Sequence, residues 1–143
     1  MNKLSKEDIV RLYDYLYDYE SLYKVEANNF DLKNEEFQTF LKNNEILLGS
    51  LSATNRKKAT SIANSILYDS SKNKTSGTDK LHHLLRHIRN SFAHGLITKK
   101  TINKKAYFVV HDKNLAGNIS MEGRIDSSLL FELINQIVKT KGI

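Results

Sequence analysis

The segment from residue 81 to residue 95 gathers side chains that can act on a phosphate ester. It runs Leu81-His82-His83-Leu84-Leu85-Arg86-His87-Ile88-Arg89-Asn90-Ser91-Phe92-Ala93-His94-Gly95. Histidine moves protons near neutral pH. Arginine never loses its charge, and its planar guanidinium donates two hydrogen bonds at once to a phosphate. These residue types therefore favour RNA as a substrate.

RNA carries its own nucleophile, the ribose 2'-hydroxyl. Cleavage needs that hydroxyl deprotonated, the charge of the phosphorane stabilised and the leaving 5'-oxygen protonated. His94 fits the proton transfers and Arg89 fits the charge, so no metal or other cofactor is required. The chain also has no dense carboxylate cluster of the kind that holds Mg²⁺. Because one histidine does not easily act as base and acid in one step, either a second group assists or two chains bring their motifs together in a two-fold dimer.

The spacing of these residues predicts a helix with two faces. At about 100° per residue, the apolar side chains fall together and face the core: Leu81, Leu85, Ile88 and Phe92. The polar side chains fall on the opposite, outward side: His83, Arg86, His87, Asn90 and His94. Arg89 lies between the two faces, about 140° from His94 on an ideal helix. The two therefore converge only if the helix ends at or near His94, where Gly95 is placed to end it.

The pattern Arg-Asn-x-x-x-His followed by glycine resembles the ribonucleases of the HEPN superfamily (higher eukaryotes and prokaryotes nucleotide-binding). The local match covers about fifteen residues, and it looks most like the small stand-alone bacterial members. The resemblance implies a dimeric α-helical bundle with a composite cleft at the dimer interface. It implies metal-independent endoribonuclease activity that leaves 2',3'-cyclic phosphate ends. Arg89 and His94 carry over as catalytic residues, and Asn90 as a polar residue that shapes the site.

The family also implies partners. Its members act as toxins of toxin–antitoxin pairs, as abortive-infection and other anti-phage factors, and as parts of RNA-targeting effectors, so an antitoxin or a defence-system partner is expected. Toxins paired with nucleotidyltransferase antitoxins often carry a tyrosine two residues after the histidine. Here that position is Leu96, which puts that particular mechanism of inactivation in doubt.

The charge of the chain is consistent with a polyanionic partner. The net charge is +6 and the pI is about 9.4. The stretch from Arg56 to Lys113 carries most of the excess, including Lys104 and Lys105. We expect the substrate-binding residues there: His83, Arg86, His87, Lys99 and Lys100. The same residues are also consistent with an ordinary solvated face.

The chain has no proline and few glycines, which favours long helices. Hydrophobic periodicity predicts a helix from Ser5 (with Asp8 in a capping box), then helices after Asn34, over 55–68 and over 80–93, and a short helix or turn at 46–48. Strands at 105–111 and 119–125 form a hairpin, and Asp126 and Ser127 cap a last helix through Lys139. We therefore predict an all-α fold, mainly a helical bundle, with a small β-hairpin before the last helix and one domain over 1–143.

The first helix carries two apolar stripes, which predicts two neighbours. One stripe is Ile9, Leu12, Leu16, Tyr19 and Tyr23, and the other is Val10, Tyr13 and Tyr17.

Composition excludes several other classes. Cysteine is absent, which rules out disulfides and cysteine-based metal sites. The sequence has no apolar run of the kind that forms a transmembrane helix or a signal peptide, so a cytoplasmic protein is expected. Two alternatives to an enzyme remain: a non-catalytic HEPN domain that binds RNA, a nucleotide or a partner protein, and a helical adaptor with no role in nucleic-acid binding.

Overall fold

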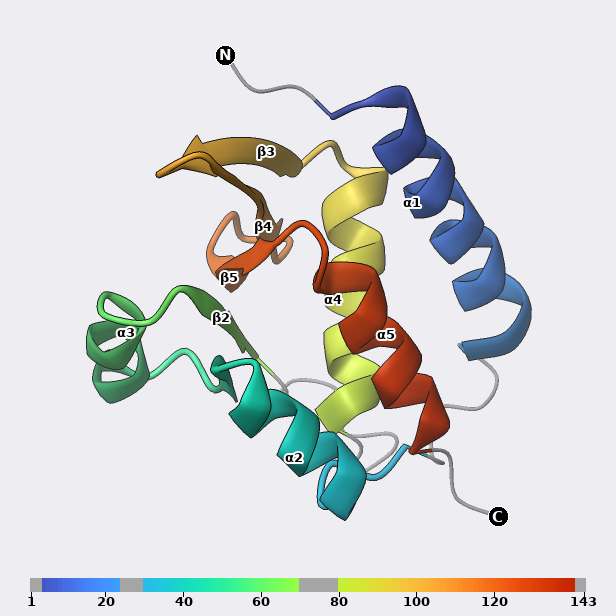
Figure 1. The fold of residues 1–143 in the computed structure, drawn as a ribbon. Coiled ribbons are helices and arrows are strands. Elements are labelled where there is room, and N and C mark those ends of the chain that lie inside the picture. The colour runs from blue at the N-terminus through green and yellow to red at the C-terminus, as the bar shows by residue number, and fades with distance from the viewer. Residues whose placement is uncertain (1–3, 24–29, 70–79, 141–143) are drawn as a thin grey trace.

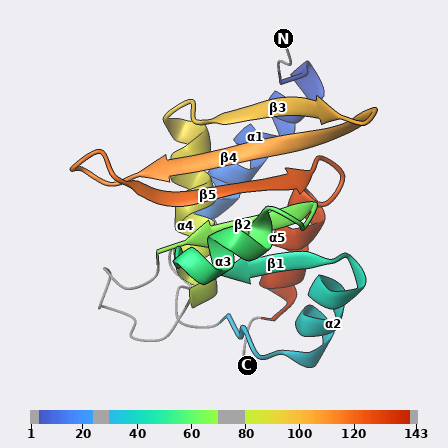
Figure 2. The ribbon, with the colours of Figure 1, turned by 90° about the vertical axis from the view of Figure 1, so that its left-hand side faces the viewer.

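A five-stranded mixed sheet forms one layer of the protein (Figures 1 and 2). The computed structural model describes residues 4–23, 30–69 and 80–140. The strands are β1 (Ile46–Gly49), β2 (Asn64–Tyr68), β3 (Ile97–Ile102), β4 (Lys105–Lys113) and β5 (Ile119–Asp126). Their order in the sheet is β1-β2-β5-β4-β3, with β1 and β2 parallel and every other pair antiparallel. The fold is therefore α/β, and the predicted all-α bundle with one hairpin is wrong.

Helices cover the two faces of this sheet unequally. The helices are α1 (Lys6–Asp18), α2 (Glu35–Asn43), α3 (Ala53–Ala59), α4 (Lys80–Ala93) and α5 (Leu130–Lys139), and a π-helical segment η1 (Tyr19–Tyr23) continues α1. One face packs against α1, α4 and α5, while α3 lies on the other face near β2 (Figure 2). In the described ranges, no helix is both long and apolar enough to cross a membrane.

Residues 46–48, predicted as a short helix or turn, and residues 64–68, predicted as the end of a helix, form the parallel pair β1 and β2. The helix predicted over 55–68 ends at Ala59, where the hydroxyls of Thr60 and Ser61 donate to backbone carbonyls of the last turn. Such local hydrogen bonds compete with helix continuation. Strand β2 is buried at all five positions because it lies between two other strands and is covered on both faces. A short apolar run of this kind cannot be assigned to helix or strand by periodicity alone.

The predicted hairpin is confirmed and extended. Strands β4 and β5 occupy the predicted ranges, and β3 joins them along the outer edge of β4. Asn103 and Lys104 connect β3 to β4, and both have positive φ angles, 51° and 67°. A two-residue connection with both residues in this region matches the twist of a tight hairpin. Strand β3 was not predicted, because it has isoleucine only at its two ends and lysine or threonine at the four positions between them.

The start of α1 follows the prediction, but its buried face is rotated. The Ser5 hydroxyl accepts from the Asp8 backbone N–H, and the Asp8 carboxylate accepts from the Ser5 N–H, which completes the capping box. The buried apolar residues are Leu12, Tyr15 and Tyr19. The hydroxyl of Tyr15 donates to the carbonyl of Leu85 at 2.5 Å and ties α1 to α4. Ile9 was expected inside but is 36% exposed.

The second stripe of α1 and the start of α5 also differ from the predictions. Val10, Tyr13 and Tyr17 are 58%, 62% and 74% exposed, so this stripe remains largely open to solvent in the single chain. Helix α5 begins at Leu130 after Leu129, which supplies no side-chain cap. The Asp126 carboxylate instead accepts from the N–H and the hydroxyl of Ser128, so the predicted cap by Asp126 and Ser127 is wrong.

Gly123 of β5 tests how tightly the sheet is packed. A Cβ at this position would collide with the carbonyl oxygen of Ser65 and lie 2.8 Å from the Cα of Ile66, both on β2. We expect Gly123→Ala to lower the free energy of unfolding by roughly 3 kcal/mol, because backbone cannot move aside as a flexible side chain does. Gly117→Ala is the control. Its φ of 85° is strained for alanine, but nothing lies within 4 Å, so a loss of about 1 kcal/mol is expected. Urea unfolding measures both variants, and equal losses of unfolding free energy in Gly123→Ala and Gly117→Ala would contradict this account.

Candidate functional site

The motif helix α4 ends where Gly95 was predicted to end it. The Leu96 N–H donates to the Ser91 carbonyl at 2.7 Å, and the Gly95 N–H donates to the Phe92 carbonyl at 3.1 Å. Gly95 has a φ of 69°, the left-handed conformation that this helix ending needs. His94 therefore stands at the cap position with an exposed side chain. The helix ends as the proposed convergence of Arg89 and His94 requires.

The polar side of α4 does not face solvent as predicted. His83 is 2% exposed and His87 is 3% exposed. The sheet covers this side of the helix, because β2 and β4 pack against α4. The ring of Tyr68 from β2 lies 6.2 Å from the ring of His87. The apolar side is buried as predicted, with Leu81, Leu85 and Ile88 fully covered. Helix α4 is therefore largely buried on both its apolar and its polar side.

A cavity of about 300 Å³ lies at the C-terminal end of α4, next to the β4–β5 hairpin. The helix and the residue that follows it contribute four of the predicted site residues to the lining: Arg86, His87, Asn90 and His94. Residues on the other side include Asp112, Lys113 and Ser120. These three residues were not among the predicted site residues, although Phe108, Val110 and Asp112 alternate along one face of β4. An aspartate in such an inward-facing series is a recognisable signal of a buried polar contact.

His87 is held at both ring nitrogens. Its Nδ1 lies 2.8 Å from Oδ2 of Asp112, and its Nε2 lies 2.8 Å from the backbone carbonyl oxygen of Asp69. A carboxylate and a carbonyl oxygen only accept hydrogen bonds, so both contacts need a proton on the ring nitrogen. His87 is therefore engaged at both ring nitrogens, one of them with the Asp112 carboxylate inside the protein. A ring engaged in this way is not free to take a proton from a substrate.

Asp112 is the centre of this network. Burial by itself raises the pKa of the Asp112 carboxyl, but hydrogen bonds from His87, Asn90 and the Lys113 N–H bring the pKa below its ordinary value. The carboxylate is therefore charged at neutral pH. Asn90 donates to Oδ2 of Asp112 at 3.2 Å and accepts from Nη1 of Arg89 at 2.9 Å. Asn90 thus links the predicted catalytic arginine to the buried ion pair.

Arg89 lies outside the cavity lining. Its Nε donates to Oε1 of Glu20, in η1, at 3.1 Å, and its side chain is 35% exposed. His94 lies in the lining, so the fold gathers Asn90 and His94 directly and connects Arg89 to them through Asn90.

Arg86 and His83 form a second contact on the same helix. Nη2 of Arg86 lies 3.4 Å from Nδ1 of His83. A guanidinium only donates, so this ring nitrogen accepts and His83 is neutral. Burial, followed by the charges of Arg86 and His87, lowers the pKa of His83 below its ordinary value. Arg86 lines the cavity, whereas His83 is absent from its lining. The buried Nε of Arg86 has no partner among the described residues.

The two predicted lysines of β3 lie on opposite faces of the sheet, as neighbours in a strand must. Lys99 faces the helices, and its Nζ lies 2.8 Å from Oδ2 of Asp8. Lys100 is exposed and shares the other face with Tyr107. Neither lysine is part of the cavity lining. The predicted pair of substrate-binding lysines is therefore separated.

The cavity combines two cations with a histidine available for proton transfer. Arg86 and Lys113 can stabilise a phosphate, and His94 is exposed at the end of the helix. Among the residues that the structure describes, no three His, Asp or Glu side chains are grouped to hold a metal ion.

A comparison with known proteins finds no matching family model, no matching curated protein and no matching solved structure. The functional interpretation therefore rests on the motif and on the geometry of this cavity.

The contribution of Asp112 to stability should depend on pH. We expect Asp112→Asn to cost about 2 kcal/mol of unfolding free energy near neutral pH, because three donors lose a charged acceptor. A carboxyl with a lowered pKa in the folded state stabilises the protein above its unfolded pKa, and this stabilisation is lost as pH falls through the folded pKa. The difference between the two proteins should therefore narrow below about pH 4. Chemical unfolding at several pH values measures this. Asp14→Asn, at an exposed carboxylate, is the control, and a gap that stays constant with pH would rule out the charge as the cause.

Proposed function

We propose that the protein is a metal-independent endoribonuclease of the HEPN type that acts on RNA in the cytoplasm. The observation that supports this most is the cavity at the end of α4, where Asn90 and His94 of the motif lie with Arg86 and Lys113. The sheet is not part of the helical bundle that the resemblance implies. The proposal is therefore one about the site, and it does not depend on the fold of that family.

The division of roles follows from which groups are free. His94 takes the proton of the 2'-hydroxyl, the 2'-oxygen bonds to phosphorus, and the bond from phosphorus to the 5'-oxygen breaks. The products are a 2',3'-cyclic phosphate and a 5'-hydroxyl after the leaving oxygen gains a proton. Arg86 and Lys113 of the lining stabilise the charge on the phosphorane, and Arg89 contributes from outside the lining, where it is bonded to Asn90. The His87–Asp112 pair positions Asn90 and takes no part in proton transfer.

Of the two histidines in this lining, His87 is held at both ring nitrogens, whereas the ring of His94 has no hydrogen-bond partner among the described residues. We therefore place the second proton-transfer group on a second chain. The exposed stripe of α1 lies close to the motif helix, since the ring of Tyr13 meets that of Phe92 edge-on at 5.3 Å. Arg89 is also held by η1, the continuation of α1. A homodimer formed through this side would bring the two motifs near each other. The same exposed side is open to an antitoxin or a defence-system partner.

Cleavage is tested with end-labelled single-stranded RNA in EDTA. We expect His94→Ala to lower the cleavage rate by at least about a hundredfold, because general acid–base catalysis contributes this much. Arg89→Ala and Asn90→Ala should also be slower, and the product should carry a cyclic phosphate. Arg11→Ala, at a cation that stacks on Phe131 away from the cavity, should cut as the wild type does. A wild type that cuts no faster than His94→Ala disproves the nuclease. RNA binding without cleavage is the result expected of a non-catalytic domain.

The dimer is tested by light scattering. The chain has a mass of 16.4 kDa, and we expect the wild type to scatter as twice this mass. Tyr17→Lys should shift the protein toward monomer, since it places a charge in the middle of an apolar contact. Ile119→Lys, at an exposed apolar residue on β5, should leave the mass unchanged. A wild type that stays monomeric at high concentration would remove the composite site.

A further inference from the structure

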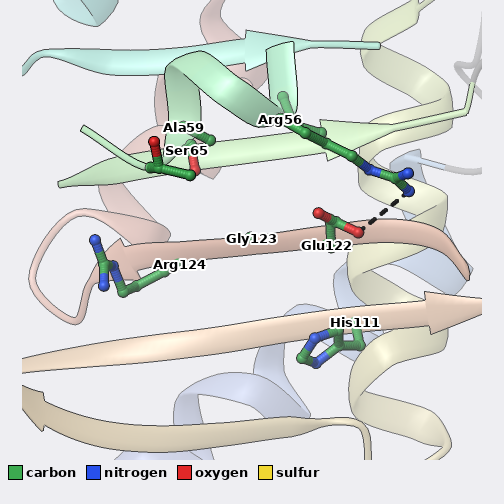
Figure 3. Close-up of a pocket in the computed structure, with 9 residues that line it drawn as sticks. Arg56, Ala59, Ser65, His111, Glu122, Gly123 and Arg124 are labelled. Atoms are coloured by element: carbon green, nitrogen blue, oxygen red, sulfur yellow. Dashed lines mark hydrogen bonds and ion pairs between the residues drawn. The ribbon is translucent and has the colours of Figure 1, made fainter. Parts of the chain in front are cut away.

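A second cavity, of about 390 Å³, lies on the face of the sheet that α4 does not cover (Figure 3). Helix α3 borders it on one side, and strands β2, β5 and β4 form its floor. Three of its lining residues can carry positive charge: Arg56 from α3, Arg124 from β5 and His111 from β4. None of them belongs to the site at the end of α4.

The guanidinium of Arg124 is fixed in position, but only some of its N–H groups donate hydrogen bonds within the described residues. Its Nε donates to the carbonyl of Ala63 at 3.2 Å, and its Nη2 donates to the carbonyl of Ile62 at 3.4 Å. Its guanidinium carbon lies 5.4 Å from the centre of the Tyr107 ring. A guanidinium has five N–H groups, so these two hydrogen bonds leave other N–H groups of Arg124 available to a ligand. An arginine held by backbone and by a ring loses little freedom when it binds an anion.

Arg56 is held more weakly. Its Nη2 lies 3.4 Å from Oε1 of Glu122, and the two side chains are 48% and 32% exposed. Figure 3 marks this ion pair with a dashed line. An exposed pair of this kind contributes little free energy, so a phosphate can compete with Glu122 for the guanidinium.

The surroundings of the cavity are basic. Lys57 and Lys58 are exposed beside Arg56 in the last turn of α3. Lys100 lies on the same face of the sheet, next to Tyr107. Asp126 on this face is paired with Lys105 at 3.1 Å. The face therefore presents a positive surface that complements a polyanion.

We propose that this open face of the sheet binds the backbone of single-stranded RNA, with Arg56 and Arg124, which lie at opposite ends of the cavity in Figure 3, contacting different phosphates. The identity of the polyanion rests on the proposed function. His111 and Asp112 are neighbours in β4, so the two cavities lie on opposite faces of one strand. RNA that occupies both must turn sharply around the end of the β4–β5 hairpin. A single strand bends in this way, whereas a duplex is stiff.

Binding is measured by fluorescence anisotropy with a labelled single-stranded RNA of about 12 nucleotides, long enough to cover several phosphate contacts. Every ribose is 2'-O-methylated, so the probe cannot be cut by 2'-hydroxyl attack. We expect Arg124→Gln and Arg56→Gln each to weaken binding about fivefold near 0.1 M salt, and to make the salt dependence shallower by about 0.7 log units per log unit of salt. Arg11→Gln and Lys139→Gln remove one charge from the helical side of the protein. Each should change the affinity by less than about twofold.

A third variant separates binding from stability. Arg124→Lys keeps the charge, so it should keep the salt dependence of the wild type, and thermal unfolding checks that each variant is folded. A folded Arg124→Gln and a folded Arg56→Gln that bind as the wild type does would overturn the inference, as would equal losses in the Arg11→Gln control. These results are independent of cleavage. If the wild type cleaves RNA but the two glutamine variants bind RNA as the wild type does, this inference alone is refuted. If the two variants bind RNA more weakly but the wild type does not cleave RNA, the nuclease proposal alone is refuted.

Discussion

The buried pair of His87 and Asp112 fixes how the central helix sits on the sheet. It joins α4 to β4, and Asn90 extends it to Arg89. An ion pair inside a protein must be well hydrogen-bonded to offset the loss of water. Here the Asp69 carbonyl and the Lys113 N–H complete the hydrogen bonds of the two partners. The helix therefore cannot rotate or slide without leaving a buried charge unpaired.

Because of this constraint, the polar residues in and next to α4 have different roles. His87 has both ring nitrogens occupied, so it positions its neighbours. His94, one residue beyond the helix, is exposed, and its ring has no such hydrogen bonds among the described residues. Arg89 donates to both Glu20 and Asn90. Its freedom to contact a substrate therefore depends on η1, the segment that carries Glu20. The proposed site is therefore anchored by the buried His87–Asp112 pair, and its exposed histidine, His94, follows the end of the helix.

Alternation along the strands distributes the basic residues between two faces. Lys99 supports α1 through Asp8, whereas Lys100 joins the open face with Arg124. His111 and Asp112 are divided in the same way between the two cavities. One short segment of β4 therefore contributes to a proposed catalytic site on one face and to a proposed RNA-binding surface on the other.

The sequence by itself determined the features that depend on near neighbours. The capping box of Ser5 and Asp8, the ending of α4 at Gly95, and the β4–β5 hairpin all follow from residues a few positions apart. The tertiary structure decided the rest. Residues 46–48 and 64–68 became strands because each pairs with a distant partner, and β2 is completed by β5. His83 and His87 were expected in water and are buried, because the sheet that covers them forms only through those long-range pairings.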